Sequence, residues 1–255
     1  MSGKNLDSLK VVLVYPNTVN REAFPPMGIA YIASYLYQQG ISVEIIDLNF
    51  EPDLEVFRKK IVLSMADVIG FSYTSPLAPS AYRCMEICKE ELPGTVVVAG
   101  GPHPTIVPHE SFDNQCIDYV VVGEGEVTFL ELLKCLVNKD SLLKVQGICY
   151  RNGGDNSIIQ NVPREAMDSL DKLPQINWNL FPNIEKYLQY SGNALPVMTS
   201  RGCPYSCSFC QPTLDKIFGK KLRYRSPEKV IQELSDLKKA NLIKSFVFQD
   251  DTFTV

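Results

Sequence analysis

Three cysteines lie close together near the end of the sequence, in the segment RGCPYSCSFCQP, with the spacing C-x3-C-x2-C: Cys203, Cys207 and Cys210. Thiolates are the usual protein ligands of iron-sulfur clusters, and a fourth cysteine would complete the ligand set of a cubane. No cysteine follows Cys210. The segment therefore predicts a 4Fe-4S cluster in which one iron has no protein ligand and is open to chemistry.

Two other interpretations of these cysteines are weaker. A structural zinc site normally takes four ligands from two separated pairs, and neither a second pair nor a histidine follows Cys210. The other alternative is a set of reduced thiols without a metal. The remaining cysteines lie in apolar helix-like or strand-like surroundings and are predicted to pack as small hydrophobes: Cys84, Cys88, Cys116, Cys135 and Cys149.

The cysteine spacing, with the aromatic Phe209 directly before Cys210, resembles the radical S-adenosylmethionine superfamily. The resemblance implies that the amino and carboxylate groups of S-adenosylmethionine bind the open iron, with Phe209 near the cofactor. It also implies that an electron from the cluster splits the sulfonium and produces a 5'-deoxyadenosyl radical. Such an enzyme needs an external electron donor of the flavodoxin or ferredoxin type.

Elements after the cysteines are expected to position this site. Residues 226–240 predict a helix with Ser226 as N-cap, and KSFVFQDDTFTV predicts a strand that ends at Asp250 and Asp251. Active sites of parallel barrels form at the carboxyl ends of the strands, so the aspartates should lie on the cluster side. By the resemblance, one of them accepts a hydrogen bond from the ammonium of S-adenosylmethionine; the alternative is a structural role in the turn.

The first 140 residues alternate short β-branched runs with longer amphipathic stretches, which is typical of a parallel sheet with crossover helices. The predicted strands are 11–16, 42–47, 68–72, 95–99 and 118–122. The predicted helices are 28–39, 54–66, 77–92, 126–137 and, more weakly, 106–113. The pattern therefore indicates a five-stranded doubly wound (Rossmann-like) α/β domain.

Loops that follow these strands are rich in glycine and polar residues. Ligands of doubly wound sheets bind at the carboxyl ends of the strands, and glycine lets the backbone approach a bulky ligand. The residues singled out there are Gly28, Ser72, Gly100, Gly101, His103, Gly123 and Glu124. Each has a plainer explanation as well: glycine pairs form turns, a loop histidine is usually a surface group, and glutamates favour a helix N-terminus.

Three segments, PPMGIAYIASYL, AGGPHPT and VVVGEGEVTFLELL, resemble the cobalamin-binding domain of many radical S-adenosylmethionine enzymes. Gly28, Ser72 and the Gly100-Gly101 pair stand where corrinoid-binding folds carry their DxHxxG, serine and double-glycine motifs. The resemblance implies a cobalamin in contact with the residues singled out above.

The histidine of that motif is absent. Ala23 and Pro25 stand where the motif has Asp and His, so the resemblance implies a corrinoid bound without a protein histidine below the metal. The alternative is a doubly wound domain that has lost its cofactor or binds another ligand.

Residues 141–194 lose the strand rhythm and are predicted to form a linker between this domain (1–140) and the start of a radical S-adenosylmethionine (β/α) barrel (195–255). QGICYRNGG and SIIQNVPRE predict a small hairpin with a tight turn at Asn152-Gly153-Gly154. Trp178, Phe181 and Tyr187 are expected to anchor the linker onto its neighbours.

Composition narrows the class of protein. The 255 residues carry a net charge of −4 with both signs interspersed, which gives no footprint for nucleic acid. No run of apolar residues is long enough to span a membrane, and no signal peptide is recognisable, so a cytoplasmic protein is expected. Two strands and one helix are a small part of a barrel, and we expect the chain to be the N-terminal part of a longer enzyme.

The leading hypothesis is a cobalamin-dependent radical S-adenosylmethionine enzyme that methylates an unactivated carbon of a small molecule. A radical cyclase or rearranging enzyme on the same scaffold is one alternative. A corrinoid-binding module without catalytic activity is the other.

Overall fold

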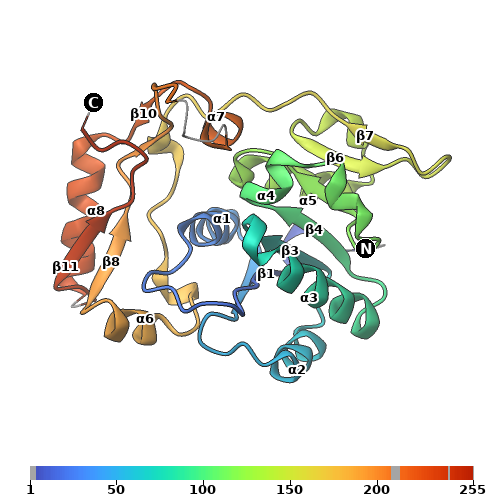
Figure 1. The fold of residues 1–255 in the computed structure, drawn as a ribbon, viewed down its shortest axis with the longest axis horizontal. Coiled ribbons are helices and arrows are strands. Elements are labelled where there is room, and N and C mark those ends of the chain that lie inside the picture. Colours follow the sequence, from blue (N-terminus) through green and yellow to red (C-terminus); the bar gives the residue numbers. More distant parts are fainter. Residues whose placement is uncertain (1–3, 208–212, 241, 255) are drawn as a thin grey trace.

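The computed structural model describes residues 4–207, 213–240 and 242–254. Its main body is a seven-stranded sheet with the order β2-β1-β3-β4-β5-β6-β7 (Figure 1). The first five strands run parallel: β1 (Lys10–Tyr15), β2 (Ser42–Asp47), β3 (Val68–Ser72), β4 (Val96–Gly100) and β5 (Tyr119–Val121). The doubly wound α/β fold is thereby confirmed.

Helices cover both faces of this sheet. They are α1 (Met27–Gln38), α2 (Leu54–Ser64), α3 (Ala78–Glu91), α4 (Pro102–Ile106) and α5 (Gly125–Asn138). The chain steps from β1 outward to β2 and then back across β1 to β3, and right-handed crossovers in opposite directions place their helices on opposite faces. Accordingly α1 packs with α5, and α2 packs with α3. The reversal leaves a topological switch point between β1 and β3.

Continuous apolar runs explain the central strands. Val11, Val12, Leu13 and Val14 of β1 are all buried, as a strand covered on both faces requires. On α1, Ile29, Ala30, Ala33 and Leu36 recur at helical spacing and are buried against the sheet. The core of the domain therefore lies between the sheet and the two helix layers.

Two strands were not expected in this sheet. The hairpin β6 (Ile148–Arg151) and β7 (Ile158–Gln160) pairs antiparallel with β5 and extends the sheet beyond the five predicted strands. The predicted two-residue turn at Asn152-Gly153-Gly154 is also wrong, because the Asn152 amide donates to the Ser157 carbonyl and the turn spans the residues between them. Pairing with the free edge of β5 satisfies backbone groups that an edge strand would leave open.

The weakly predicted helix 106–113 is wrong in its bounds. Its place is taken by α4 and a 3-10 helix, η3 (Glu110–Asp113). Pro108 lies between them, and a proline lacks the amide that a continuous helix needs. The other 3-10 helices are η1 (Leu6–Ser8), η2 (Ser75–Leu77), η4 (Leu142–Lys144), η5 (Leu170–Lys172) and η6 (Trp178–Leu180).

The linker crosses back over the α/β domain. Its η6 contacts α1 and β2, and its helix α6 (Ile184–Tyr190) follows. Trp178 and Phe181 are buried, and the Tyr187 hydroxyl donates to Asp47 Oδ2 at 2.8 Å. The prediction that these three aromatic residues anchor the linker is confirmed.

The elements from residue 194 onward form the last segment, and a small unit within it lies at the left of Figure 1. Strands β8 (Ala194–Val197) and β11 (Ser245–Phe248) pair in parallel, and α8 (Pro227–Lys239) connects them as a crossover helix. Between them lie β9 (Ser200–Arg201), α7 (Thr213–Phe218) and β10 (Arg223–Tyr224), with β9 and β10 antiparallel. Ser226 occupies the N-cap of α8, but its side chain makes no capping hydrogen bond.

Within the described ranges, no helix has both the length and the apolar character that crossing a bilayer requires.

Candidate functional site

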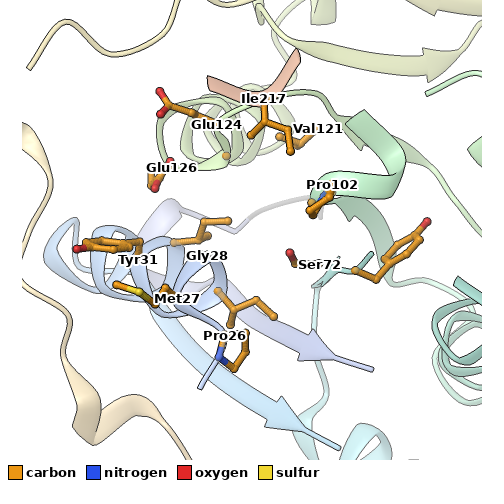
Figure 2. Close-up of a pocket in the computed structure, with 18 of the residues that line it drawn as sticks. Pro26, Met27, Gly28, Tyr31, Ser72, Pro102, Val121, Glu124, Glu126 and Ile217 are labelled. Atoms are coloured by element: carbon orange, nitrogen blue, oxygen red, sulfur yellow. The ribbon is translucent and has the colours of Figure 1, made fainter. Parts of the chain in front are cut away.

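A pocket of about 660 Å³ opens at the carboxyl ends of the parallel strands, beside the switch point (Figure 2). One wall comes from the loops after β1, β3, β4 and β5, together with the start of α1. The other wall comes from the last segment: Met198, Ser200, Arg201, Ile217, Phe218, Gln249 and Asp251. The strand-end loops and the cysteine-bearing segment therefore enclose one common space.

The loops after β3 and β4 fit tightly together. Ser72 and Gly100 are register partners, and the Tyr73 amide donates to the Gly100 carbonyl at 3.2 Å. Gly101 has φ +90°, and a Cβ there would lie 2.7 Å from Ser72 Oγ and 2.8 Å from the Tyr73 amide nitrogen. Glycine is therefore required at 101 by both backbone conformation and space.

Six of the seven residues predicted to contact cobalamin line the pocket: Gly28, Ser72, Gly100, Gly101, Gly123 and Glu124. Figure 2 shows Gly28 at the start of α1 facing Ser72 and Pro102 across the space, with Glu124 and Glu126 above. Sequence positions nearly 100 residues apart are thus brought together by the parallel topology. The cofactor contact itself stays a prediction.

His103 is the exception, because it is not among the lining residues. Its Nδ1 lies 3.0 Å from Ser75 Oγ, its Nε2 lies 3.5 Å from the Tyr82 hydroxyl, and its ring packs beside Tyr73. Burial lowers the pKa of His103, against a smaller opposing effect of Glu110. The geometry gives His103 the structural role of holding the loops after β3 and β4.

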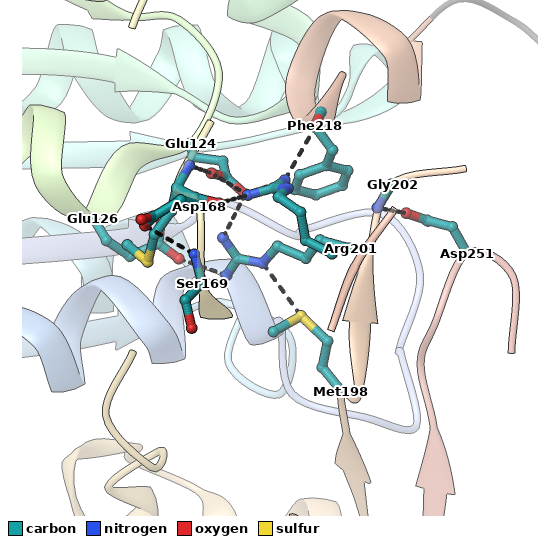
Figure 3. A network of polar contacts seen from close by, with 11 residues as sticks. Glu124, Glu126, Asp168, Ser169, Met198, Arg201, Gly202, Phe218 and Asp251 are labelled. Atoms are coloured by element: carbon teal, nitrogen blue, oxygen red, sulfur yellow. Dashed lines mark hydrogen bonds and ion pairs between the residues drawn. The ribbon is translucent and has the colours of Figure 1, made fainter. Parts of the chain in front are cut away.

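Glu124 is engaged by arginines of the last segment (Figure 3). Its Oε1 accepts from Arg201 at 3.0 Å and from Arg223 at 2.9 Å, and its Oε2 accepts from Arg223 at 3.0 Å and from the Met167 amide at 3.2 Å. Burial alone would raise the pKa of Glu124, but Arg223 and Arg201 outweigh it and lower that pKa. The carboxylate is thus committed to joining the two walls.

Arg201 was missed from the sequence. It is 6% exposed, and besides Glu124 it binds Glu126 Oε1 at 2.6 Å. Its guanidinium also lies over the rings of Tyr31 and Phe218. Burial works against the charge, yet Glu126 and Glu124 raise the pKa of Arg201 above its ordinary value. The sequence shows Arg201 only as a charge beside the cysteines, and its partners lie far away in the chain.

Arg223 and Arg225 were missed as well. They alternate with Tyr224, and both arginines are buried while Tyr224 is exposed. Two charged residues at strand spacing share one face. Only the structure shows that Tyr224 is exposed and that the face shared by the two arginines is the inner one.

The cysteine loop begins directly after Arg201. Gly202 has φ +95°, and a Cβ there would lie 2.8 Å from the Lys221 carbonyl oxygen. The Thr252 hydroxyl lies 3.2 Å from Cys203 Sγ, and Cys203 is half-buried whereas Cys207 is exposed. Cys210 and Phe209 lie outside the described residues, so their predicted roles rest on the sequence.

The two aspartates after β11 differ in their contacts. Both oxygens of Asp250 are bound: Oδ1 accepts from the amides of Thr199 and Ser200, and Oδ2 accepts from the Thr199 hydroxyl. Asp251 lines the pocket, and its Oδ2 accepts from the Gly202 amide at 3.3 Å. Asp250 therefore has a structural role, whereas Asp251 is placed to meet a ligand.

Burial raises the pKa of Asp251, and neighbouring Asp250 adds to that, while the Gly202 amide and Arg201 oppose it. A cationic group of a ligand would relieve this cost, since an opposite charge favours the ionised carboxylate.

Both predicted cofactors suit the residues present. Glycines on the strand-end loops leave the pocket wall open to a flat, bulky group, and neither of the chain's two histidines is among the lining residues. Cys203 and Cys207 carry free thiols, the donors that iron-sulfur clusters use. Without Cys210, the described residues hold no group of three metal-ligating side chains.

Comparisons with known proteins agree with this geometry. The model of the B12 binding domain family matches residues 18–133. An uncharacterized methyltransferase of Pyrococcus horikoshii is 36% identical over 262 residues, covering 97% of this chain and 54% of that protein. The anaerobic magnesium-protoporphyrin IX monomethyl ester cyclase of Synechocystis sp. is 31% identical over 242 residues, covering 93% of this chain and 47% of that protein.

Among solved structures, OxsB, a cobalamin-dependent S-adenosylmethionine radical enzyme with aqua-cobalamin and S-adenosylmethionine bound, superposes with a TM-score of 0.80. It is 23% identical, and the match covers 97% of this chain and 34% of that one, which shows a shared fold. The chain spans about half the length of the curated relatives it matches. The chain carries a B12-binding domain and is homologous to the N-terminal part of cobalamin-dependent radical S-adenosylmethionine enzymes.

Proposed function

We propose that the pocket binds cobalamin and that Cys203, Cys207 and Cys210 hold a 4Fe-4S cluster which cleaves S-adenosylmethionine. The chain then forms part of an enzyme that methylates an unactivated carbon of a small molecule. One observation carries the proposal: the last segment, which bears the cysteines, contributes Arg201 and Asp251 to the wall of the same pocket that the strand-end loops form. A corrinoid there and a cluster on the cysteines would face a common space.

The residues of the two pocket walls have different roles. The loops after β3 and β4, locked by Gly101 against Ser72, keep the strand edge open for a planar group. Asp251 presents a carboxylate to the pocket and, in this proposal, accepts from the ammonium of S-adenosylmethionine. The apolar lining from Met27, Ile29, Phe129 and Phe218 excludes water from reactive species.

When bound, the cofactors would supply a methyl-carrying cobalt and a low-potential electron for cleavage of the sulfonium. Electrons would come from a protein of the flavodoxin or ferredoxin type. Comparing the rate of S-adenosylmethionine cleavage with such a donor and with a chemical reductant tests this partner.

Reconstitution with iron, sulfide and hydroxocobalamin tests the proposal. The wild-type chain should take up iron, show iron-sulfur absorption and retain the corrinoid. Replacing all three triad cysteines with alanine should abolish iron uptake and leave corrinoid binding intact. Equal iron content in the triple variant would contradict the cluster assignment.

Methyl transfer has a competitor in radical cyclisation, which the similarity to the anaerobic cyclase favours. The full-length enzyme incubated with methyl-labelled S-adenosylmethionine separates the two, because label in the product requires methyl transfer. A corrinoid-binding module without catalysis is the third outcome: it would retain cobalamin but never cleave S-adenosylmethionine.

A further inference from the structure

Arg201 sits between the pocket wall and the first cysteine. Its guanidinium binds Glu124 at 3.0 Å and Glu126 at 2.6 Å, and its Nε lies 3.2 Å from Met198 Sδ. The two glutamates flank Gly125 at the start of α5, and Glu124, Gly125 and Glu126 all line the pocket. Arg201 is thus fixed to the wall that the α/β domain builds.

The backbone that follows Arg201 has little freedom. Gly202 packs so closely on the Lys221 carbonyl that no side chain fits, and its amide donates to Asp251. Cys203 comes next, with the Thr252 hydroxyl 3.2 Å from its sulfur. Because only Gly202 separates Arg201 from Cys203, anchoring Arg201 on the wall restricts where the backbone can place Cys203.

We infer that Arg201 is a positioning residue that fixes Cys203 against the α/β wall of the pocket, so that filling the pocket and placing Cys203 are coupled. That cobalamin fills the pocket and that Cys203 binds a cluster rest on the proposed function. The positioning itself rests only on the contacts of this chain. Coupling of this kind is reciprocal: whatever orders the wall orders the cysteine, and the reverse.

A second buried ion pair in the same segment supplies a matched control. Arg225 is 5% exposed, and it binds Glu233 Oε2 at 2.5 Å and the Met198 carbonyl at 3.0 Å. Its carboxylate partner is on α8, and neither Arg225 nor Glu233 is among the residues that line the pocket. Arg225 also contacts the wall residue Met198, so the control is made at the carboxylate: Glu233→Gln breaks an ion pair of similar burial and keeps the contact of Arg225 with Met198.

Alkylation of Cys203 and Cys207, the two triad thiols that the structure describes, measures the placement of Cys203 without any cofactor. In the metal-free chain, N-ethylmaleimide labelling of Cys203 and Cys207 is followed by peptide mass spectrometry, and the ratio of the two labelling rates is compared between variants.

Arg201→Met and Glu126→Gln should each raise the Cys203 to Cys207 ratio about tenfold, because a buried charged hydrogen bond is lost. Glu233→Gln should change it less than about twofold. The two substitutions Arg201→Met and Glu126→Gln change the local charge in opposite directions, so a rise in both separates placement from electrostatic activation of the thiol.

A similar rise in Glu233→Gln, or no rise in Arg201→Met, would overturn the inference. Hydroxocobalamin tests the coupling: it should lower the ratio in the wild type and leave it unchanged in Arg201→Met. Binding without an effect on Cys203 would refute the coupling. If hydroxocobalamin fails to bind the wild type, the proposed function fails, while the ratio still decides the role of Arg201.

Discussion

Two segments dock onto the α/β domain by opposite means. The linker docks through apolar side chains: Leu170, Leu173, Ile176, Trp178 and Phe181 are all buried. The cysteine-bearing segment docks through buried arginines: Arg201 and Arg223 both pair with Glu124, and Arg201 also pairs with Glu126. The linker only has to stay attached to the α/β domain. The cysteine-bearing segment forms half of the pocket, so it also has to keep one orientation relative to that domain.

Physical chemistry accounts for the difference. Apolar contact is non-directional and depends mainly on buried area, so it tolerates small displacements. A bidentate arginine–carboxylate pair fixes both angle and distance, and breaking it leaves a buried charge uncompensated. We call the contact of the linker with the α/β domain the apolar joint and the contact of the cysteine-bearing segment with that domain the polar joint. The polar joint is less stable than apolar packing could make it, but it fixes the geometry between the strand-end loops and the cysteines.

The largest expected effect comes from Glu124→Gln. Among the described residues, Arg223 forms an ion pair with Glu124 alone, so the change leaves a buried guanidinium without a carboxylate. We expect the free energy of unfolding to fall by about 3 to 5 kcal/mol, measured by urea denaturation. Glu165→Gln, at an exposed glutamate of the linker, is the control and should cost less than about 0.5 kcal/mol. A small loss for Glu124→Gln would mean that the polar joint does not fix the segment.

A smaller effect is expected at Asp47, the polar contact within the apolar joint. Burial raises the pKa of Asp47 to about 6, although the Asn49 amide and the Tyr187 hydroxyl favour its charged form. The folded protein therefore binds the proton more tightly than the unfolded chain does, and the contribution of Asp47 to stability is lost as pH rises from about 4 to about 6.

Asp47→Asn removes this titration. The difference in unfolding free energy, wild type minus variant, should fall by on the order of 2 kcal/mol between pH 4 and pH 7. Urea denaturation followed by the fluorescence of Trp178 measures it. A difference that stays constant over this range would show that Asp47 does not titrate in the folded protein as its burial requires.

The smallest effect is expected for Phe181→Leu. Phe181 packs edge-on against Tyr187 and beside Trp178, and an apolar side chain of similar size can occupy its place. The loss should be about 1 kcal/mol, against about 3 kcal/mol or more for Phe181→Ala, which leaves a cavity. If the leucine variant lost as much as Glu124→Gln, the contrast between the two joints would disappear.

The sequence predicted the helices and strands more fully than the contacts between them. Strands 42–47 and 68–72 coincide with β2 and β3, because apolar β-branched runs bounded by turns are local signals. The pairing of the β6–β7 hairpin with β5, which β6 makes, is a long-range event without a local signal. The same holds for Arg201, whose burial depends on Glu124 and Glu126, 77 and 75 residues away.

Site residues follow the same rule. Gly28, Ser72 and Gly101 reach the pocket because parallel topology brings strand ends together wherever they lie in the chain. His103 and Asp250 look equally functional in the sequence, yet their side chains point into hydrogen bonds with Ser75 and with the Thr199 backbone. The direction of a loop side chain follows from its neighbours in space, which the sequence does not reveal.

Titration of the wild-type chain with hydroxocobalamin, followed by visible absorption, tests the central claim most directly. The account predicts one corrinoid per chain, with affinity preserved in His109→Ala because that imidazole does not line the pocket. Gly101→Ala should weaken binding by about tenfold or more, since its Cβ would displace Ser72 and Tyr73. Gly153→Ala, at a glycine with open space around it, should change nothing. Undiminished binding in Gly101→Ala, or loss of binding in His109→Ala, would contradict the account.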